Sequence, residues 1–253
     1  MEFRPCIDIH QGKVKQIIGS SLNSSKSEAE ENFVAEKSAE YFASLYKEDG
    51  LAGGHVIMLD DSQQTKQEAI KALKAYPDGL QIGGGITDQS APEFIRAGAS
   101  QVIVSSFIFV DGRLSESRLT GLKKAIGKDR LVLDLSCRYR GDEYVVVIDR
   151  WQTFTDYAVT VENLKALSRY CAEFLVHGVD SEGKRQGIEE DLLATLSEFT
   201  DIPVTYAGGV RSLTDVEQIR QVGQDKVNFT VGSSLDIFGG DLDYREVINY
   251  LKQ

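Results

Sequence analysis

Cysteine, basic charge and long apolar runs are all scarce in this sequence. The three cysteines, Cys6, Cys137 and Cys171, form neither a CxxC pair nor an even-numbered set, which argues against a disulfide framework and favours a reducing compartment. No apolar run approaches the roughly 18 residues that a membrane helix needs. The first residues, MEFRPCID, show neither the basic nor the apolar region of a secretory signal. We therefore expect a soluble, cytoplasmic protein with no membrane partner.

Acidic residues outnumber basic ones, 39 to 28, which gives a net charge of −11. An acidic surface repels the phosphate backbone, so we do not expect a nucleic-acid partner. The net charge does not exclude a small phosphorylated ligand, because local backbone amides and a few cations hold such a ligand. The length of 253 residues fits one large α/β barrel as well as two small domains.

Short β-type segments alternate with amphipathic helical segments along the whole chain. Strands are predicted near 3–8, 55–59, 79–82, 101–104, 131–135, 173–177, 203–206 and 227–231. Helices are predicted near 34–50, 65–76, 91–98, 115–126, 160–172, 188–199, 214–222 and 242–252. Eight strand–helix units in strict alternation indicate a parallel sheet, and eight strands are the number that closes a barrel. The sequence therefore predicts a single α/β domain over 1–253, a (β/α)₈ TIM barrel, with a doubly wound open sheet as the alternative.

Two segments interrupt this alternation. Residues 20–32, SSLNSSKSEAEEN, are polar and are predicted to form either a surface loop or a lid on the active face, where the loops after barrel strands lie. Residues 142–151, DEYVVVIDRW, alternate like an extra strand and are predicted to fold as a hairpin over the same face.

The two halves of the chain repeat the same pattern. CIDIHQGK corresponds to VLDLSCRYRG, LQIGGGITD to VTYAGGVRS, and VIVSSF to TVGSSL. The matched residues lie about half the chain apart: Asp8 and Asp134, Gly84 and Gly208, Ser105 and Ser233. This pattern indicates that four strand–helix units were duplicated, which gives half-barrels of about 1–125 and 126–253.

Each half carries a glycine pair at a strand end and a serine pair one strand later. Glycines let a ligand approach the backbone closely, the following helix turns its N–H groups toward the ligand, and serine hydroxyls add donors. A single glycine-rich strand end is also an ordinary turn, but two on opposite sides of one barrel predict a ligand with a phosphate at each end. The predicted phosphate-binding residues are Gly84, Gly85, Ser105, Ser106, Gly208, Gly209, Gly232, Ser233 and Ser234.

Asp8 and Asp134 each end an apolar strand, in PCIDI and LVLDL. A carboxylate among apolar residues is costly to bury without partners. At half-chain separation the two would face each other between the phosphate sites, where one base and one acid can act on the middle of a bisphosphorylated ligand. For either residue, the alternative is a structural carboxylate that bonds to the backbone or to a lysine.

The motifs CIDIHQGKVKQ, QIGGGI, DLSCR, AGGV and VGSSLDIFGG occur in this order and resemble the ProFAR isomerase family of histidine biosynthesis. The resemblance covers essentially the whole chain and is closest to the eukaryotic branch. It implies a (β/α)₈ barrel without metal or cofactor that converts the aminoaldose ProFAR to the aminoketose PRFAR, a substrate with two phosphoribosyl groups. By the same resemblance Asp8 is the general base at C2′ and Asp134 is the general acid that opens the ribose ring.

The sequence departs from the bacterial pattern of this family. In the bacterial fifth-strand motif, Asp-Thr-Arg, the acid lies two residues before the arginine, whereas Asp134 lies four residues before Arg138. The difference of two residues keeps the same face of the strand and places Asp134 about 6.6 Å deeper along it. His177 stands where the family has Thr, and it is a second candidate for proton transfer or for bonding the acid. The alternative is a strand-end histidine that bonds only to the backbone. Three further positions bear on the substrate: Glu182 stands where the family has Asp, Thr87 replaces a phosphate-binding Arg, and Arg211 supplies a cation in the second half.

Three more side chains are predicted to contact substrate. Lys15 follows the first-strand turn within reach of a phosphate, Arg138 follows the fifth strand, and Trp151 stacks on the imidazole of the substrate, as the family's Gly-Trp motif implies. The alternatives are a solvated lysine and a tryptophan that packs the hairpin onto the barrel. The pair Asp60–Asp61 has no His or Glu at ligand spacing, so no metal site is predicted there.

Two other functions fit parts of the sequence. The sister cyclase of the same pathway shares the fold, the repeat and both aspartates, but CIDIH, DLSCR and SSLDIFGG favour the isomerase. A non-catalytic phosphosugar-binding barrel would keep the glycines and need not keep Asp8 and Asp134. A second activity on phosphoribosylanthranilate stays open. We expect a monomer whose partner is a small bisphosphorylated substrate.

Overall fold

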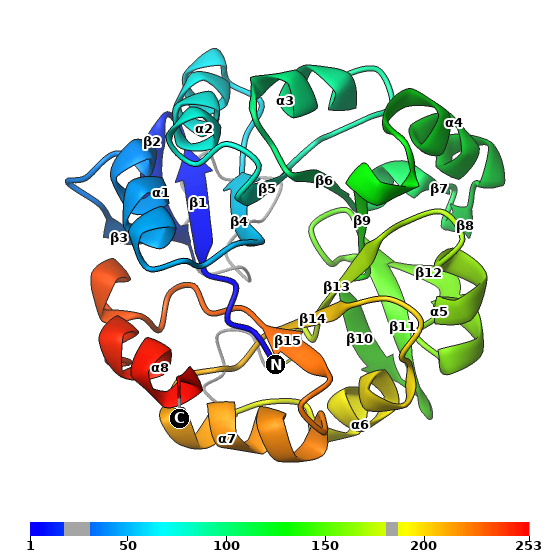
Figure 1. Ribbon diagram of the computed structural model, residues 1–253. Helices are drawn as coiled ribbons and strands as arrows, with labels where there is room; N and C mark the ends of the chain where they lie inside the picture. Colours follow the sequence, from blue (N-terminus) through cyan, green and yellow to red (C-terminus); the bar gives the residue numbers. More distant parts are fainter. Residues whose placement is uncertain (18–30, 181–186, 253) are drawn as a thin grey trace.

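Eight parallel strands form the inner ring of the structure, and helices surround them (Figure 1). The computed structural model describes residues 1–17, 31–180 and 187–252. Within these residues the eight strands follow one another around the ring in chain order, as in a (β/α)₈ barrel. They are β1 (Cys6–His10), β4 (Gly54–Met58), β5 (Leu80–Gly83), β6 (Gln101–Val104), β9 (Leu131–Asp134), β13 (Glu173–His177), β14 (Val204–Ala207) and β15 (Val227–Phe229).

Backbone hydrogen bonds between the first residues of the chain and β15 close the ring. Phe229 N donates to Glu2 O at 3.0 Å and Arg4 N donates to Phe229 O at 2.9 Å, on either side of a parallel bridge between Phe3 and Phe229. The α/β barrel is therefore confirmed, and the open-sheet alternative is excluded. The extent of the domain over 1–253 and its division into half-barrels stay predictions.

Most helices of the described residues begin at a capping side chain. Such caps accept a backbone N–H of the first turn and so replace a missing helical partner. The capping residues are Ser38, Ser62, Ser115, Thr160, Ser212 and Asp243. The helices are α1 (Ala39–Glu48), α2 (Gln63–Ala75), α3 (Ala91–Ala97), α4 (Glu116–Ile126), α5 (Val161–Leu167), α6 (Glu190–Glu198), α7 (Leu213–Val222) and α8 (Tyr244–Leu251). The exceptions, which begin without a side-chain cap, are α3 and α6.

Helix α1 starts later than predicted. The predicted span of 34–50 begins on the last residue of a strand, β3 (Glu31–Val34), and the helix starts only after the cap at Ser38. Its buried residues include Ala39, Phe42 and Tyr46, which form an apolar stripe toward the barrel.

The end of the barrel at which the carboxyl ends of its strands lie is called the mouth below. Additional strands follow the barrel strands at this end. β2 (Lys13–Ile17) pairs antiparallel with β1 and with β3. The predicted hairpin at 142–151 is confirmed as part of a three-stranded sheet that continues from β9. Its strands are β10 (Cys137–Arg140), β11 (Glu143–Ile148) and β12 (Thr153–Ala158), and a small ladder of β7 (Phe109–Val110) and β8 (Arg113–Leu114) follows β6. Most of the polar segment 20–32 lies outside the described residues.

The barrel interior consists of an apolar layer between two polar layers. The apolar layer contains Ile57, Ile103, Val132, Leu175 and Ala207. Side chains two residues apart on a strand share a face, so each strand carries a column of inward residues. Two such columns are Gln101, Ile103 and Ser105 along β6, and Glu173, Leu175 and His177 along β13. The polar residues at the mouth are thus separated by apolar packing from those at the opposite end, the floor.

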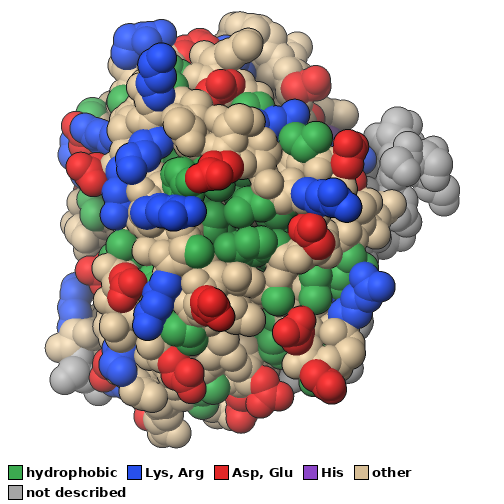
Figure 2. Space-filling model, turned by 90° about the vertical axis from the view of Figure 1, so that its right-hand side faces the viewer, with side chains coloured by type: hydrophobic (Ala, Val, Ile, Leu, Met, Phe, Trp, Pro, Cys, Tyr) green, Lys and Arg blue, Asp and Glu red, His purple; other side chains and the backbone are tan. Residues whose placement is uncertain are grey.

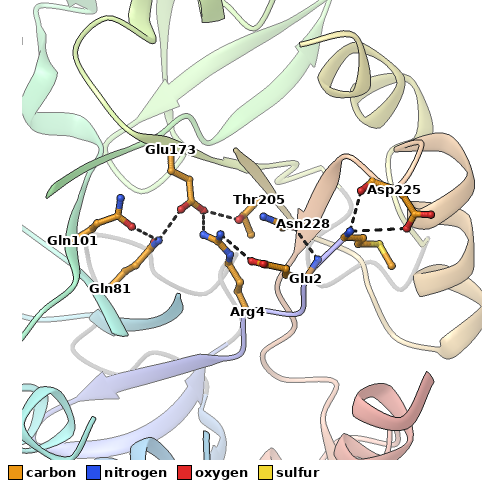
Figure 3. A network of polar contacts seen from close by, with 9 residues as sticks. Glu2, Arg4, Gln81, Gln101, Glu173, Thr205, Asp225 and Asn228 are labelled. Carbon is orange, nitrogen blue, oxygen red and sulfur yellow. Dashed lines mark hydrogen bonds and ion pairs between the residues drawn. The ribbon is translucent and has the colours of Figure 1, made fainter. Parts of the chain in front are cut away.

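The floor is a hydrogen-bonded network centred on Glu173 (Figure 3). Glu173 Oε1 pairs with Arg4 Nη1 and accepts from Thr205 Oγ1 at 2.7 Å, and its Oε2 accepts from Gln81 Nε2 at 2.9 Å. Gln81 Nε2 also lies 2.9 Å from Gln101 Oε1. Arg4 and Glu173 are only 8% and 3% exposed. Each buried charge is therefore compensated by the other in place of water. The network joins the chain before β1 to four barrel strands.

The outer surface is mixed in character. Figure 2 shows the face that includes α4, α5 and β12, where charged side chains of both signs surround a central group of hydrophobic ones. In the described part of the chain, no helix combines the length and the apolar character needed to cross a bilayer.

Candidate active site

Three ionisable side chains stand at the mouth end of the barrel strands. Asp8 lies on β1, Asp134 is the last residue of β9, and His177 is the last residue of β13; all three are partly exposed. In the ring of eight strands, β1 is the first and β9 the fifth. The two carboxylates therefore approach the mouth from opposite sides, as the half-chain separation led us to expect.

Asp134 lies among hydrogen-bond donors. Ser136 Oγ donates to Asp134 Oδ1 at 3.1 Å, and the Ser105 side chain donates to the same carboxyl group. Burial raises the pKa of Asp134 above its ordinary value, against opposing effects of His177 and of the two serines. A carboxyl group with a raised pKa keeps its proton to higher pH and can act as an acid. Ser105, which the sequence assigned to a phosphate, thus contacts Asp134.

His177 packs edge-to-face against Trp151, which lies between β11 and β12. The ring centroids are 5.0 Å apart and the interplanar angle is 82°. Trp151 is the third of three consecutive residues with positive φ, 53° at Asp149, 56° at Arg150 and 66° at Trp151. Positive φ is unfavourable for a bulky residue, and backbone strain of this kind is concentrated at ligand sites. The strained turn holds the indole beside His177.

Asp8 lies close to a thiol and to a buried carboxamide. Cys6 Sγ donates to Asp8 Oδ1 at 2.9 Å. A Cβ atom at Gly232 would lie 4.0 Å from Asp8 Oδ2 and 3.2 Å from Gln16 Oε1, so both side chains border this glycine. Gln16 is 3% exposed, and its Nε2 has no hydrogen-bond partner among the described residues. A buried donor of this kind is suited to a ligand atom.

The second strand contributes two polar side chains, of which sequence reasoning found only one. Lys13 pairs with His10, so Lys15, two residues further, lies on the face of β2 that continues the face of His10 and Asp8. Lys15 is 5% exposed, which excludes the alternative of a solvated lysine. Gln16 was missed because nothing in the sequence relates it to Gly232, more than 200 residues away.

The two glycine pairs adopt the same backbone conformation. φ is 104° and 64° at Gly84 and Gly85, and 118° and 71° at Gly208 and Gly209. A Cβ at Gly84 would lie 2.0 Å from Met58 O, whereas a Cβ at Gly85 would have no neighbouring atom of the described residues within 4 Å. In the first pair, Gly84 is therefore required by packing against β4, and Gly85 leaves the backbone open to a ligand.

We expect Gly84→Ala and Gly85→Ala to differ strongly in stability. The Gly84 variant forces β5 away from β4 and should lose more than about 3 kcal/mol of unfolding free energy, by overpacking added to backbone strain. The Gly85 variant carries only the cost of its positive φ, about 1–2 kcal/mol. Urea denaturation of both variants measures the difference; equal losses would show that the close contact with Met58 is relieved without cost.

Arg211 follows the second glycine pair and is held by Asp215 of α7. Asp215 Oδ2 accepts from Arg211 N at 3.0 Å and from Ser212 Oγ at 2.9 Å, and it lies 3.9 Å from Arg211 Nε. The guanidinium remains half exposed. A cation at this position, next to a glycine pair and a helix N-terminus, is suited to a phosphate.

Arg138 points to a different partner. Its Nε donates to Asp180 Oδ1 at 2.9 Å, and Tyr139 N donates to Asp180 Oδ2 at 2.9 Å. The pair ties β10 to the segment that follows β13.

Among the other predicted residues, Ser106 and Ser233 are exposed, Gly232 and Ser234 are partly exposed, and Glu182 lies outside the described residues.

Asp60 is a structural carboxylate of the segment between β4 and α2. It accepts from Gln11 N at 2.6 Å, from Ser62 N at 2.8 Å and from Thr65 Oγ1 at 2.8 Å. Burial raises its pKa, but hydrogen bonds from Ser62, Gln11 and Thr65 outweigh this and lower the pKa to about 2. Over the residues that the structure describes, no group of three or more His, Cys, Asp and Glu side chains is arranged to hold a metal ion.

Comparison with known proteins decides the family. The model of a family described as "Histidine biosynthesis protein" matches residues 2–240. The chain belongs to this family. The resemblance seen in the sequence motifs is therefore confirmed.

Members of the histidine biosynthesis family from a plant and from fungi are similar over the whole barrel. A Medicago truncatula protein named 1-(5-phosphoribosyl)-5-((5-phosphoribosylamino)methylideneamino) imidazole-4-carboxamide isomerase, chloroplastic, is 51% identical over 257 residues, covering 100% of this chain and 82% of the relative. Proteins of the same isomerase name from Neurospora crassa and Saccharomyces cerevisiae are 50% and 42% identical. They cover 94% and 95% of this chain and 93% and 94% of their own lengths. The predicted likeness to eukaryotic members is confirmed.

Proposed function

We propose that this chain is the isomerase that converts ProFAR to PRFAR in histidine biosynthesis. One observation carries the proposal: two aspartates on the first and fifth strands, Asp8 and Asp134, flank a mouth that has an equivalent glycine pair on the third and seventh strands. The names of the plant and fungal relatives support the same reaction. The enzyme is then an aldose–ketose isomerase.

The chemistry needs one acid and one base. Asp134, whose pKa is raised by burial, gives its proton to the ring oxygen of the ribose. The bond between C1′ and the ring oxygen breaks, and the nitrogen lone pair forms an iminium bond to C1′. Asp8 then removes the C2′ proton, the C2′–H electron pair forms a C1′–C2′ double bond, and the π electrons of the iminium bond return to nitrogen. Transfer of the C2′ hydroxyl proton and protonation of C1′ give the aminoketose. No atom is gained or lost, so the reaction calls for no redox partner.

The two ends of the substrate are assigned to the two glycine-paired loops. Gly85 and its neighbours bind one phosphate, and Gly209 with Arg211 binds the other. Lys15 and Gln16 lie on the β1 side of the mouth. Two fixed phosphates hold the sugar between the carboxylates, which is where orientation contributes most to the rate. Trp151 and His177 border the same space and are assigned to the imidazole end.

Location and assembly are part of the proposal. We place the protein in the cytoplasm as a monomer, with the small-molecule substrate as its partner. One relative is named as chloroplastic, so the compartment differs among members of the family.

Turnover of two substrates tests the proposal. The purified chain should convert ProFAR to PRFAR, followed by absorbance, and should leave PRFAR unchanged when ammonia is supplied. Consumption of PRFAR with ammonia would identify the sister cyclase instead, and binding of ProFAR without turnover would identify a phosphosugar-binding barrel. Phosphoribosylanthranilate in the same assay reveals whether a second substrate is accepted.

The pH profile should respond to the donors around Asp134. An acid must be protonated, so activity falls as the pH rises through the pKa of Asp134, which burial has raised. Ser136→Ala removes a donor that stabilises the charged carboxylate, which raises this pKa further. The alkaline limb of kcat/KM should therefore move to higher pH in the variant. A shift to lower pH, or none, would remove Asp134 as the acid and leave His177 as the candidate.

A further inference from the structure

The thiol of Cys6 has an unusual position directly beneath Asp8. The two residues are two apart on β1 and share its inward face, while Ile7 and Ile9 are buried on the other face. Tyr46 Oη of α1 donates to the carbonyl oxygen of Cys6 at 3.2 Å, and Cys6 pairs in register with His55 of β4. The backbone that carries the thiol is therefore held from outside the barrel and from the neighbouring strand.

The hydrogen bond from this thiol distinguishes the two oxygens of the Asp8 carboxylate. Oδ1 is the acceptor for Cys6 Sγ, at 2.9 Å. Oδ2 is the oxygen on the side of Gly232, 4.0 Å from the position of a Cβ there, next to the predicted phosphate residues that follow β15. The thiol thus bonds to one carboxylate oxygen, and the other oxygen is turned toward the ligand side of the mouth.

We propose that Cys6 is a positioning residue for Asp8: its S–H group holds Oδ1 so that Oδ2 is aimed at the C2′ proton of the substrate. This inference rests on the proposed role of Asp8 as the base. Cys6 makes no contact with the reacting atoms in this scheme and acts only through the carboxylate.

A thiol suits this task because it is a weak donor. Strong donors such as ammonium groups favour the charged form of a carboxylate and so reduce its tendency to accept a proton. A base that must take a proton from carbon needs both a fixed orientation and high basicity. An S–H donor supplies this orientation without a charge of its own, and its apolar character fits the inside of a barrel strand.

Three cysteine variants test the inference. Cys6→Ala removes the donor and is expected to lower kcat about 10- to 100-fold with KM within about twofold of wild type, because orientation is lost while the phosphate contacts remain. Cys6→Ser restores a donor at the same atom and should bring kcat to within about threefold of wild type. Cys171→Ala is the matched control: its thiol is buried in the segment between α5 and β13 and donates to Leu167 O at 3.7 Å, so kcat should not change.

A deuterium isotope effect separates positioning from simple packing. With substrate deuterated at C2′, the isotope effect on kcat should be larger in Cys6→Ala than in wild type, because proton removal becomes the slower step. The inference is overturned if kcat of Cys6→Ala stays within twofold of wild type, if Ala and Ser are equally impaired, or if kcat falls with an unchanged isotope effect. Asp8→Asn, assayed in parallel, keeps the two proposals apart: an active Asp8→Asn refutes the role of the base itself, whereas an inactive Asp8→Asn with a normal Cys6→Ala refutes only the role of the thiol.

Discussion

Replacing Asp8 by Asn is expected to lower kcat for ProFAR roughly 10²- to 10⁴-fold, the usual contribution of a general base, with KM within a few-fold of wild type. Asn keeps the size of the side chain and an acceptor oxygen for Cys6 Sγ, but it cannot take a proton from C2′. The loss therefore falls on the transition state and not on the bound ground state. Steady-state conversion of ProFAR gives kcat and KM, and calorimetric titration with PRFAR checks that binding is retained.

A second Asp-to-Asn change serves as the matched control. Asp243 caps α8 by accepting from Glu246 N at 2.9 Å, a role that Asn fills as well. Asp243→Asn removes the same charge from an exposed helix cap that carries none of the proposed site residues, and it should leave kcat unchanged. If Asp8→Asn kept kcat within tenfold of wild type, Asp8 would not be the base, and the two-carboxylate mechanism would have to be abandoned.

Replacing Glu173 by Ala should cost about 3–5 kcal/mol of unfolding free energy, the range for removal of one partner of a buried ion pair. The change leaves the Arg4 guanidinium, which is 8% exposed, without its carboxylate, and it also removes the acceptor of Thr205 Oγ1 and Gln81 Nε2. The floor is separated from the mouth by the apolar layer, so kcat of the folded fraction should stay near wild type. Urea denaturation measures the free energy of unfolding.

Two comparisons show whether burial is the cause. Asp225 lies 3.9 Å from the N-terminal amine and is 66% exposed, so Asp225→Ala should cost less than about 0.5 kcal/mol. The double variant Arg4→Met, Glu173→Leu removes both charges and should recover part of the loss of Glu173→Ala, because no charge is then left unpaired. A loss below about 1 kcal/mol for Glu173→Ala would mean that water or another group solvates Arg4 in the variant.

The strand positions were predictable because each barrel strand is a short apolar segment between two polar ones. LVLDL and EFLVH were placed at 131–135 and 173–177, and the structure has β9 at Leu131–Asp134 and β13 at Glu173–His177. Parallel strands buried on both faces give continuous apolar runs that are hard to mistake at this length. The start of α1 was less well predicted. The residues before Ser38 carry no apolar pattern that distinguishes the end of a strand from the beginning of a helix.

The candidate site was predictable as a set of residues but not as a set of contacts. Alternation along a strand shows that Asp8, Asp134 and His177 share the inward surface, and the repeat relates the first two. It does not show that Ser105 donates to Asp134, that Arg138 pairs with Asp180, or that Trp151 packs on His177. Each of these pairs joins segments far apart in the chain.

The sequence by itself therefore determined the order of the elements, the closed eight-unit barrel and the pair of opposed carboxylates, because these follow from local periodicity and from a duplicated pattern. Only the tertiary structure decided which donors surround each carboxylate: Cys6 at Asp8, and Ser105 with Ser136 at Asp134. The floor network around Glu173 was likewise not foreseen. The physical reason is that side-chain partners across a barrel depend on how the strands are staggered around the ring and on where the mouth loops fold back, and neither quantity is encoded in the spacing along one strand.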